Sequence, residues 1–127
     1  MEKPSRGRNG RKSNNESFRA AHDELVDKIV AALSATAMGR FWGQPTGAAY
    51  RNGSLVRYGL IGSADISGIL IGGRRVEIEV KTGKAIQSDE QKFFESMIKM
   101  MGGIYFVAHS VDEAINSLKS MAAPHEV

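Results

Sequence analysis

The sequence contains no cysteine. The chain can therefore form neither a disulfide scaffold nor a metal site with thiolate ligands. It also lacks any apolar run close to the roughly 18 residues that a membrane span requires, and its first residues do not show the pattern of a signal peptide. A cytoplasmic location is the default expectation.

The charge of the chain is uneven. The 127 residues carry a net charge of +3, and their 42% apolar content is ordinary for one globular domain with a modest core. Residues 1–12 alone sum to +4, from Lys3, Arg6, Arg8, Arg11 and Lys12 against Glu2. We expect residues 1–14 to form a disordered basic leader and residues 15–127 a single domain. The leader is either a solubilising tail or an arm that contacts nucleic-acid phosphates.

The first predicted helix runs from Asn15 to Ala37, with Gly39 as its stop signal. Its apolar stripe comprises Phe18, His22, Leu25, Val26, Ile29, Val30 and Leu33. A lone histidine in such a stripe is more often packed in a core than used as a ligand. Glu24 borders the stripe, so it could reach a site where the helix packs on a sheet.

The segment 41–60 has a broken pattern. The run Arg51-Asn52-Gly53-Ser54 predicts a turn, and 55–58 predicts a short strand. Aromatic side chains alternate here with basic ones: Trp42, Tyr50 and Tyr58 with Arg40, Arg51 and Arg57. Two interpretations stand open. These side chains form a surface that meets nucleic acid, or the aromatic ones cover one edge of a small sheet.

The stretch Gly62–Lys81 (GSADISGILIGGRRVEIEVK) predicts a β-hairpin with its turn at Gly72-Gly73. Side chains alternate faces along a strand. Val76, Ile78 and Val80 therefore share an apolar face, while Glu77, Glu79 and Lys81 share the opposite, charged face. The apolar face suits a core, and the charged face needs a chemical explanation.

The remaining residues predict a helix, a strand and a helix. A turn at 82–85 is followed by a capping box, Ser88 with Gln91, which opens a helix that Gly102-Gly103 ends. The apolar run 104–108 predicts a strand buried in the middle of a sheet. A second capping box, Ser110 with Glu113, starts a last helix that ends near Met121. The order is αβββαβα, which predicts an α/β fold with a central mixed sheet flanked by helices.

The charged face of the hairpin predicts a cation site. If Asp65 and Glu79 point to the same side, their oxygens can share a hard cation such as Mg²⁺, with a backbone carbonyl as a further ligand. Lys81 lies on the same face as Glu79. It could hold or deprotonate a metal-activated water, or neutralise a phosphate oxygen. This chemistry suits the hydrolysis of a phosphodiester.

The turn geometry constrains that site. A two-residue turn at Gly72-Gly73 would set Asp65 opposite Val80 and therefore on the face away from Glu79. The site requires an offset of one residue, from a three-residue loop or from a bulge at Gly68. We predict such an offset.

Asp65 and Glu79-Val80-Lys81 resemble the D…(D/E)xK signature of the PD-(D/E)xK nuclease superfamily. The run from Gly62 to Gly103 resembles the VRR-NUC family within it, and Gln91 falls at the glutamine of that family's helix. The resemblance covers about residues 41–115 and is specific in the hairpin and the following helix. One departure is Ala64, where the family usually has a proline that does no chemistry.

The resemblance implies a restriction-endonuclease-like fold and Mg²⁺-dependent cleavage of DNA, with Mn²⁺ as a substitute. Asp65, Glu79 and the Val80 carbonyl would bind metal, Lys81 would serve catalysis, and Gln91 would support the site. A glutamate of the first helix often completes the metal shell, and Glu24 is expected there, with Glu16 as the alternative. Arg51, Arg57 and Lys84 are the expected DNA contacts.

Short stand-alone members of the family resemble viral or bacterial nucleases that act as homodimers on Holliday junctions. The resemblance thus implies branched DNA as substrate, a homodimer, and the cytoplasm of a bacterium or an infected host cell. A dimer is physically reasonable because a two-fold junction needs two cuts. The alternatives are a DNA-binding module of the same fold that has lost cleavage, a restriction-like nuclease on linear duplex, and a small metal-binding or scaffold protein with an acidic face.

Overall fold

The structure is a computed structural model that describes residues 6–45 and 47–123. It contains, in chain order, α1 (Arg6–Ala35), β1 (Gly39–Gly43), β2 (Gly47–Arg51), β3 (Ser54–Tyr58), β4 (Ile66–Leu70), β5 (Arg75–Val80), α2 (Asp89–Met100), β6 (Ile104–Ala108) and α3 (Val111–Ala122). The predicted α/β class with a central mixed sheet is confirmed. The strands β1 and β2 are additions to the predicted order.

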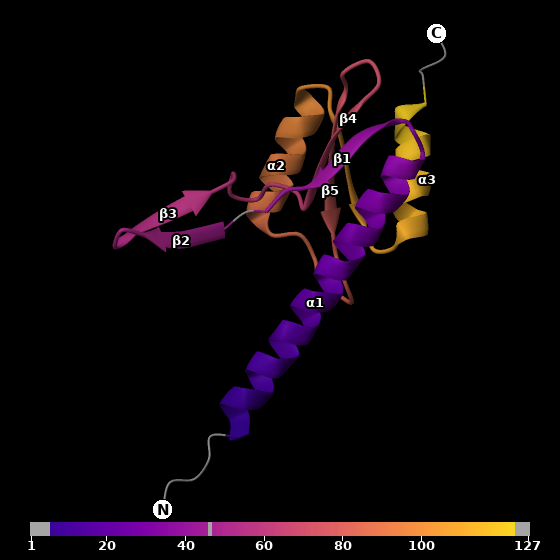
Figure 1. Cartoon of the computed structure of the whole chain (residues 1–127). Coiled ribbons are helices and arrows are strands. Elements are labelled where there is room, and N and C mark those ends of the chain that lie inside the picture. Colours follow the sequence, from indigo (N-terminus) through magenta and orange to yellow (C-terminus); the bar gives the residue numbers. More distant parts are fainter. Residues whose placement is uncertain (1–5, 46, 124–127) are drawn as a thin grey trace, which may run out of the picture.

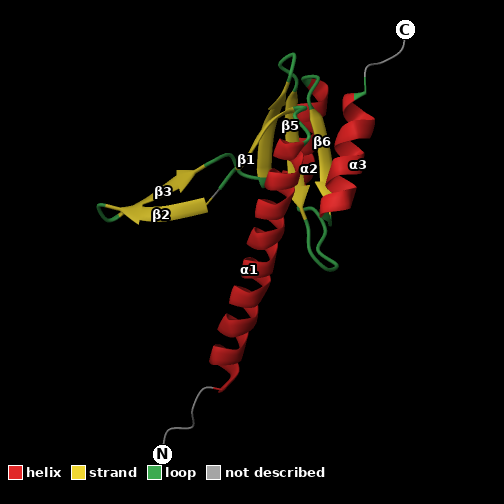
Figure 2. Cartoon of the chain, turned by 45° about the vertical axis from the view of Figure 1, so that its right-hand side comes forward, coloured by secondary structure: helices red, strands yellow, loops and turns green. Residues whose placement is uncertain are grey.

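Four strands form the central sheet in the order β1-β4-β5-β6. β4 runs antiparallel to both β1 and β5, and β6 runs parallel to β5. Helices α1 and α3 cover one face of this sheet, and α2 covers the other (Figures 1 and 2). The pair β2–β3 forms a separate two-stranded hairpin that projects away from the sheet (Figure 1).

The alternation of β5 divides the core into two clusters. Val76, Ile78 and Val80 pack against α1 and α3, as predicted for the apolar face. Glu77 and Glu79 point to the α2 face, and both are buried. Charged side chains are rarely buried without partners. These two glutamates therefore mark the α2 face as the one that carries chemistry.

The strand β6 is buried as predicted, but its position is not the predicted one. Within the described chain it lies at an edge of the sheet, next to β5 alone. Its apolar composition has another cause. Ile104 and Phe106 pack under α3 and α1, whereas Tyr105 packs under α2, so both faces of this edge strand are covered.

The predicted offset of the β4–β5 hairpin is confirmed. Leu70 and Arg74 close the hairpin through a bond of 2.9 Å from the Leu70 N–H to the Arg74 carbonyl, which leaves a three-residue loop, 71–73. Gly72 and Gly73 both have positive φ, at 102° and 97°, a conformation that residues with a Cβ rarely adopt. The loop therefore supplies the offset.

The alternative source of the offset, a bulge at Gly68, is wrong. Gly68 pairs with Val76 in an unbroken register that also pairs Ile66 with Ile78. Continued by one residue, this register sets Asp65 opposite Glu79. Directly opposed residues of an antiparallel pair point to the same face.

The first helix differs from its prediction at both ends. It begins at Arg6, so residues 6–14 of the predicted disordered leader are helical, while residues 1–5 lie outside the described chain. Extending a helix that is already anchored adds one hydrogen bond per residue fixed, which explains why a polar segment can join it.

No helix in the described part of the chain combines the length and the apolar character needed to cross a membrane.

Gly39 is not the stop signal of α1. The helix ends at Ala35, and the turn that follows places Ala37 at a φ of 58°. Gly39 instead starts β1, where a Cβ would collide with the Ile69 carbonyl of the paired strand. Its function is to allow close approach of two backbones.

Both predicted helix starts in the second half are confirmed. Ser88 and Gln91 form the complete capping box at the start of α2. At α3 the box is half formed. Ser110 accepts from the Glu113 N–H at 3.1 Å, but the Glu113 carboxylate turns to the N–H and the ring of His109.

We expect Gly39→Ala to destabilise the protein by about 1–3 kcal/mol, because the new methyl group meets backbone that cannot move aside. Gly43→Ala is the matched control at the other end of β1. A Cβ there would meet only a Val26 methyl carbon at 3.9 Å. Thermal unfolding of both variants checks this. Equal unfolding temperatures for the two would contradict it.

Candidate active site

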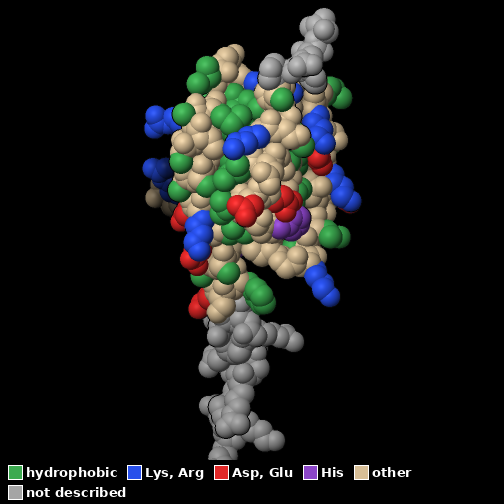
Figure 3. Space-filling view, turned by 90° about the vertical axis from the view of Figure 1, so that its right-hand side faces the viewer, with side chains coloured by type: hydrophobic (Ala, Val, Ile, Leu, Met, Phe, Trp, Pro, Cys, Tyr) green, Lys and Arg blue, Asp and Glu red, His purple; other side chains and the backbone are tan. Residues whose placement is uncertain are grey.

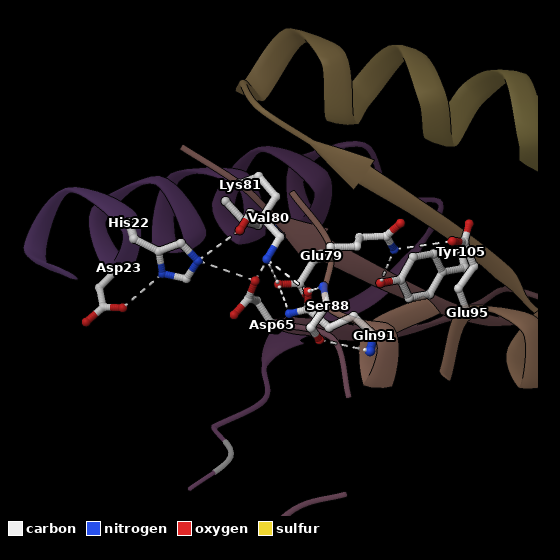
Figure 4. Close-up of polar contacts among 11 residues, drawn as sticks. His22, Asp23, Asp65, Glu79, Val80, Lys81, Ser88, Gln91, Glu95 and Tyr105 are labelled. Carbon is white, nitrogen blue, oxygen red and sulfur yellow. Dashed lines mark hydrogen bonds and ion pairs between the residues drawn. The ribbon is translucent and has the colours of Figure 1, made fainter. Parts of the chain in front are cut away.

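The open end of the β4–β5 hairpin brings two carboxylates together. Asp65 precedes β4, Glu79 lies near the end of β5, and the two side chains meet within hydrogen-bonding reach (Figure 4). Asp65 is held in place by the Val80 N–H, which donates to Oδ2 at 2.8 Å. The Asp65 side chain is 26% exposed and that of Glu79 only 4%. The cluster is therefore open to solvent on the Asp65 side alone.

The Glu79 carboxylate is only half satisfied. Its Oε1 accepts from Gln91 Nε2 at 2.9 Å and lies 3.4 Å from Lys81 Nζ. Its Oε2 is buried and finds no hydrogen-bond partner among the described residues. Burial, followed by the nearby Asp65 carboxylate, raises the pKa of Glu79 to about 8, and the Lys81 ammonium only partly opposes this. Such a buried oxygen is satisfied either by the proton that Glu79 then keeps and donates toward Asp65, or by a cation that replaces that proton.

Gln91 links the site to helix α2. Its side-chain oxygen accepts from the Ser88 N–H at 2.9 Å as part of the capping box, and from Lys81 Nζ at 3.0 Å. Its amide nitrogen meanwhile donates to Glu79. Both polar ends of Gln91 are thus occupied, which orients the Lys81 ammonium toward Glu79. The predicted residues Asp65, Glu79, Lys81 and Gln91 all lie in one cluster (Figure 4).

The first helix contributes His22 to this cluster. Its Nε2 lies 3.0 Å from the Val80 carbonyl and 3.3 Å from Asp65 Oδ2, while Nδ1 lies 3.3 Å from Asp23 Oδ1. All three partners are acceptors, so the ring is best satisfied when both nitrogens carry protons. Burial lowers the pKa of His22, but Asp65, Asp23 and the Val80 carbonyl together outweigh it and leave the pKa raised.

Glu24, the residue expected to complete the metal shell, does not reach the site. It is exposed and pairs with Lys28 at 3.1 Å, one turn further along the helix. A shift of two residues turns a helix side chain by more than half a turn. Glu24 therefore points elsewhere when His22 faces the sheet. The alternative, Glu16, is exposed as well.

Two acidic residues that the sequence did not single out lie beside the site. Asp23 and Asp27 line a cleft of about 430 Å³ together with His22 and Asp65. The available signal was their spacing. Residues four apart share a helix face, and His22 was the one polar member of an otherwise apolar stripe. His22 is the position at which the helix face that packs on the core meets the cleft.

The donor set fits a hard divalent cation such as Mg²⁺ or Mn²⁺. Asp65 and Glu79 supply carboxylate oxygens, including the unpartnered Oε2, and the Val80 carbonyl adjoins them. His22 already places an imidazole between Asp65 and that carbonyl, so these oxygens favour a positive charge. In the described part of the chain, no three His, Cys, Asp or Glu side chains converge on one point. Magnesium retains several waters and needs only a few protein oxygens.

The expected DNA contacts lie outside this cluster. Arg51 and Arg57 belong to the projecting β2–β3 hairpin, and Lys84 lies in the loop after β5; all three are exposed. Tyr50 and Tyr58 on the hairpin are also exposed and lie outside the central sheet, whereas Trp42 lies on its edge strand β1. Comparison of the sequence with protein-family models and with curated proteins found no match.

The raised pKa of Glu79 predicts a pH-dependent stability. Between its usual value of 4.5 and about 8, the folded protein keeps a proton that the unfolded chain releases. The free energy of unfolding should therefore fall as the pH rises through this window. We expect Glu79→Gln, which mimics the protonated acid, to be about 1–3 kcal/mol more stable than the wild type at pH 8 without metal.

The gain should vanish below pH 4.5, where the wild-type carboxyl is protonated in both states. Chemical denaturation across this pH range measures it. Glu24→Gln makes the same change at an exposed position and serves as the control. A gain that does not vary with pH would contradict the assignment of the shift to Glu79.

Proposed function

We propose that the chain is a metal-dependent DNA endonuclease that hydrolyses phosphodiester bonds. The observation that carries the proposal is the pairing of Asp65 with Glu79 beside Lys81, with one buried Glu79 oxygen left unpartnered. A carboxyl group whose pKa is raised by burial and by a neighbouring carboxylate is unfavourable for stability alone. The presence of two neighbouring carboxylates at this point makes sense if a cation is the missing partner.

Each residue of the site has a proposed role. Asp65, Glu79 and the Val80 carbonyl would hold Mg²⁺, and the bound ion would activate a water and neutralise phosphate charge. Lys81 holds its ammonium 3.4 Å from Glu79 Oε1, where it would stabilise the charge that develops on the scissile phosphate. Gln91 is a positioning residue, because it fixes Glu79 and Lys81 relative to each other.

The arrangement of elements supports a restriction-endonuclease-like fold and membership of the VRR-NUC group within the PD-(D/E)xK nucleases. An antiparallel β1–β4–β5 sheet with a parallel β6, reached through α2, suits the fold that the resemblance implies. Ala64, which stands in place of the usual proline, is fully buried in the α2-face cluster. Packing of Ala64 against Phe94 and Tyr105 would then shape the chain before Asp65.

The β2–β3 hairpin is the proposed DNA-contacting arm. It presents Arg51 and Arg57 together with exposed tyrosines, a combination that suits phosphate and base contacts. The face turned away from the hairpin, seen in Figure 3, carries basic and acidic side chains interspersed with apolar ones. A mixed face of this kind lacks the single-sign field that draws DNA. The hairpin side is therefore the proposed substrate side.

The direct test is cleavage of purified DNA with and without Mg²⁺. We expect cleavage only with metal, and a loss of at least about a hundredfold in rate for Glu79→Gln, for Asp65→Asn and for Lys81→Met. The matched control is Glu24→Gln, which should cleave like the wild type because Glu24 lies away from the site. The rate of appearance of cut strands measures this.

Two results would contradict the enzyme assignment. One is metal-independent cleavage that survives in Glu79→Gln. The other is DNA binding without cleavage under any divalent metal, which would identify a binding module of the same fold that has lost cleavage.

The proposed substrate is branched DNA such as a four-way junction, and the proposed active form is a homodimer. A two-fold junction requires two cuts, and the described chain builds one site. We expect faster cutting of a four-way junction than of linear duplex of the same sequence, and a solution mass of two chains by ultracentrifugation. Equal cutting of linear duplex would instead favour a restriction-like role.

A further inference from the structure

A second cavity lies next to the proposed active site, on the same face of the sheet. It measures about 300 Å³ and is lined by Gln44, Leu60, Ser63, Ser67, Arg75, Glu77, Phe94, Met97 and Ile98. Glu77, on its floor, precedes Glu79 by two residues on β5, which corresponds to about 6.6 Å along a strand. Ser63 and Ser67 lie two residues before and after Asp65. The cavity and the carboxylate pair are therefore immediate neighbours.

The lining combines flat apolar walls with a polar floor. Leu60, Met97 and Phe94 supply apolar lining, and the volume is at the lower end of the range for ligand pockets, roughly 300–1,000 Å³. On the floor, Ser67 Oγ donates to Glu77 at 2.9–3.0 Å, and Arg75 Nε donates to the same carboxylate at 2.7 Å. The Arg75 side chain is half exposed. Apolar walls over hydrogen-bonding edges suit a small planar heterocycle.

One polar atom of the lining is left over. Ser63 Oγ is buried and finds no hydrogen-bond partner within the described chain. Its position is rigid, because Ser63 N–H bonds to the Leu60 carbonyl at 3.0 Å and the adjoining Gly62 packs so close to the Glu90 backbone that a Cβ would not fit. A fixed, buried and unsatisfied hydroxyl calls for a polar ligand group.

The cavity and the cleft beside Asp65 share a wall. Gln44 lines both, and its backbone N–H donates to the Asp65 carbonyl at 2.7 Å. Gln44 and Leu60 also stand at the two ends of the segment that carries the β2–β3 hairpin. A nucleotide whose phosphate lies at the carboxylate pair would therefore have its base within reach of the cavity.

We propose that this cavity binds an unpaired nucleobase of the DNA strand that is cut. Phe94, Met97 and Leu60 contact the faces of the ring, and Ser63, Glu77 and Gln44 meet its polar edge. The inference rests on the proposed function and adds to it a preference for one feature of the DNA, an unpaired base beside the cut. The enzyme selects DNA whose nucleotide next to the scissile phosphate is already unstacked, because extruding a paired base costs free energy.

The test compares two duplexes that differ by one nucleotide. One is fully paired, and the other carries a single unpaired 2-aminopurine. Fluorescence anisotropy in EDTA, at one fixed salt concentration, measures binding without cleavage. We expect the wild type to bind the unpaired-base duplex about tenfold more tightly than the paired one.

Ser63→Leu should abolish this preference, because the new side chain fills the cavity and removes the free hydroxyl. Ser120→Leu, at an exposed position on α3, should behave like the wild type. Acrylamide quenching provides a readout without any variant. The 2-aminopurine in the wild-type complex should be less accessible to acrylamide than in free DNA.

The possible failures differ. Equal wild-type affinity for both duplexes, together with full quenching, would overturn the base pocket while Mg²⁺-dependent cleavage could still stand. A preference that persists in Ser63→Leu would also overturn it. If the wild type binds neither duplex, the pocket falls, whereas the nuclease assignment falls only if the four-way junction is not cut with Mg²⁺ either.

Discussion

The register of the β4–β5 hairpin is the constraint on which the rest of the site depends. A loop of three residues, 71–73, sets Asp65 opposite Glu79, whereas a two-residue turn would send Asp65 into the apolar core. Because side chains alternate along a strand, a shift of one residue moves a whole strand's side chains to the other face. The two glycines at positive φ therefore decide whether the carboxylates can meet.

Helix α2 then converts this pair into an asymmetric site. Its capping box places Gln91 over β5, and that side chain holds Lys81 on one side and Glu79 on the other. The same helix walls the neighbouring cavity with Phe94, Met97 and Ile98. A single helix end thus serves two neighbouring features, so a change in its cap would disturb both.

Helix α1 contributes His22 to the site, although the position of His22 in the apolar stripe favoured a place in the core. His22 lies between Asp65 and the Val80 carbonyl, with its Nε2 3.3 Å from Asp65 Oδ2 and 3.0 Å from the carbonyl oxygen. Beyond it, Asp23 and Asp27 make the cleft acidic. Negative charge near the proposed phosphate path is unfavourable for DNA, and a bound divalent cation would offset it.

The sequence by itself predicted the three helices, the strands β3 to β6 and the α2 cap, but it missed β1 and β2. It also predicted a cluster of Asp65, Glu79 and Lys81 on condition of an offset in the hairpin, and Gln91 joined that cluster through the family resemblance. The elements and the cap follow from local rules, namely alternation along strands and capping, whereas the Gly72-Gly73 turn alone favoured the register without the offset. Only the tertiary structure decided that His22 rather than Glu24 reaches the site, that β6 lies at an edge, and that Ser63 lines a cavity. Each of these depends on how separate elements pack, and the rotation of a helix against a sheet is set by the whole core, which no local pattern contains.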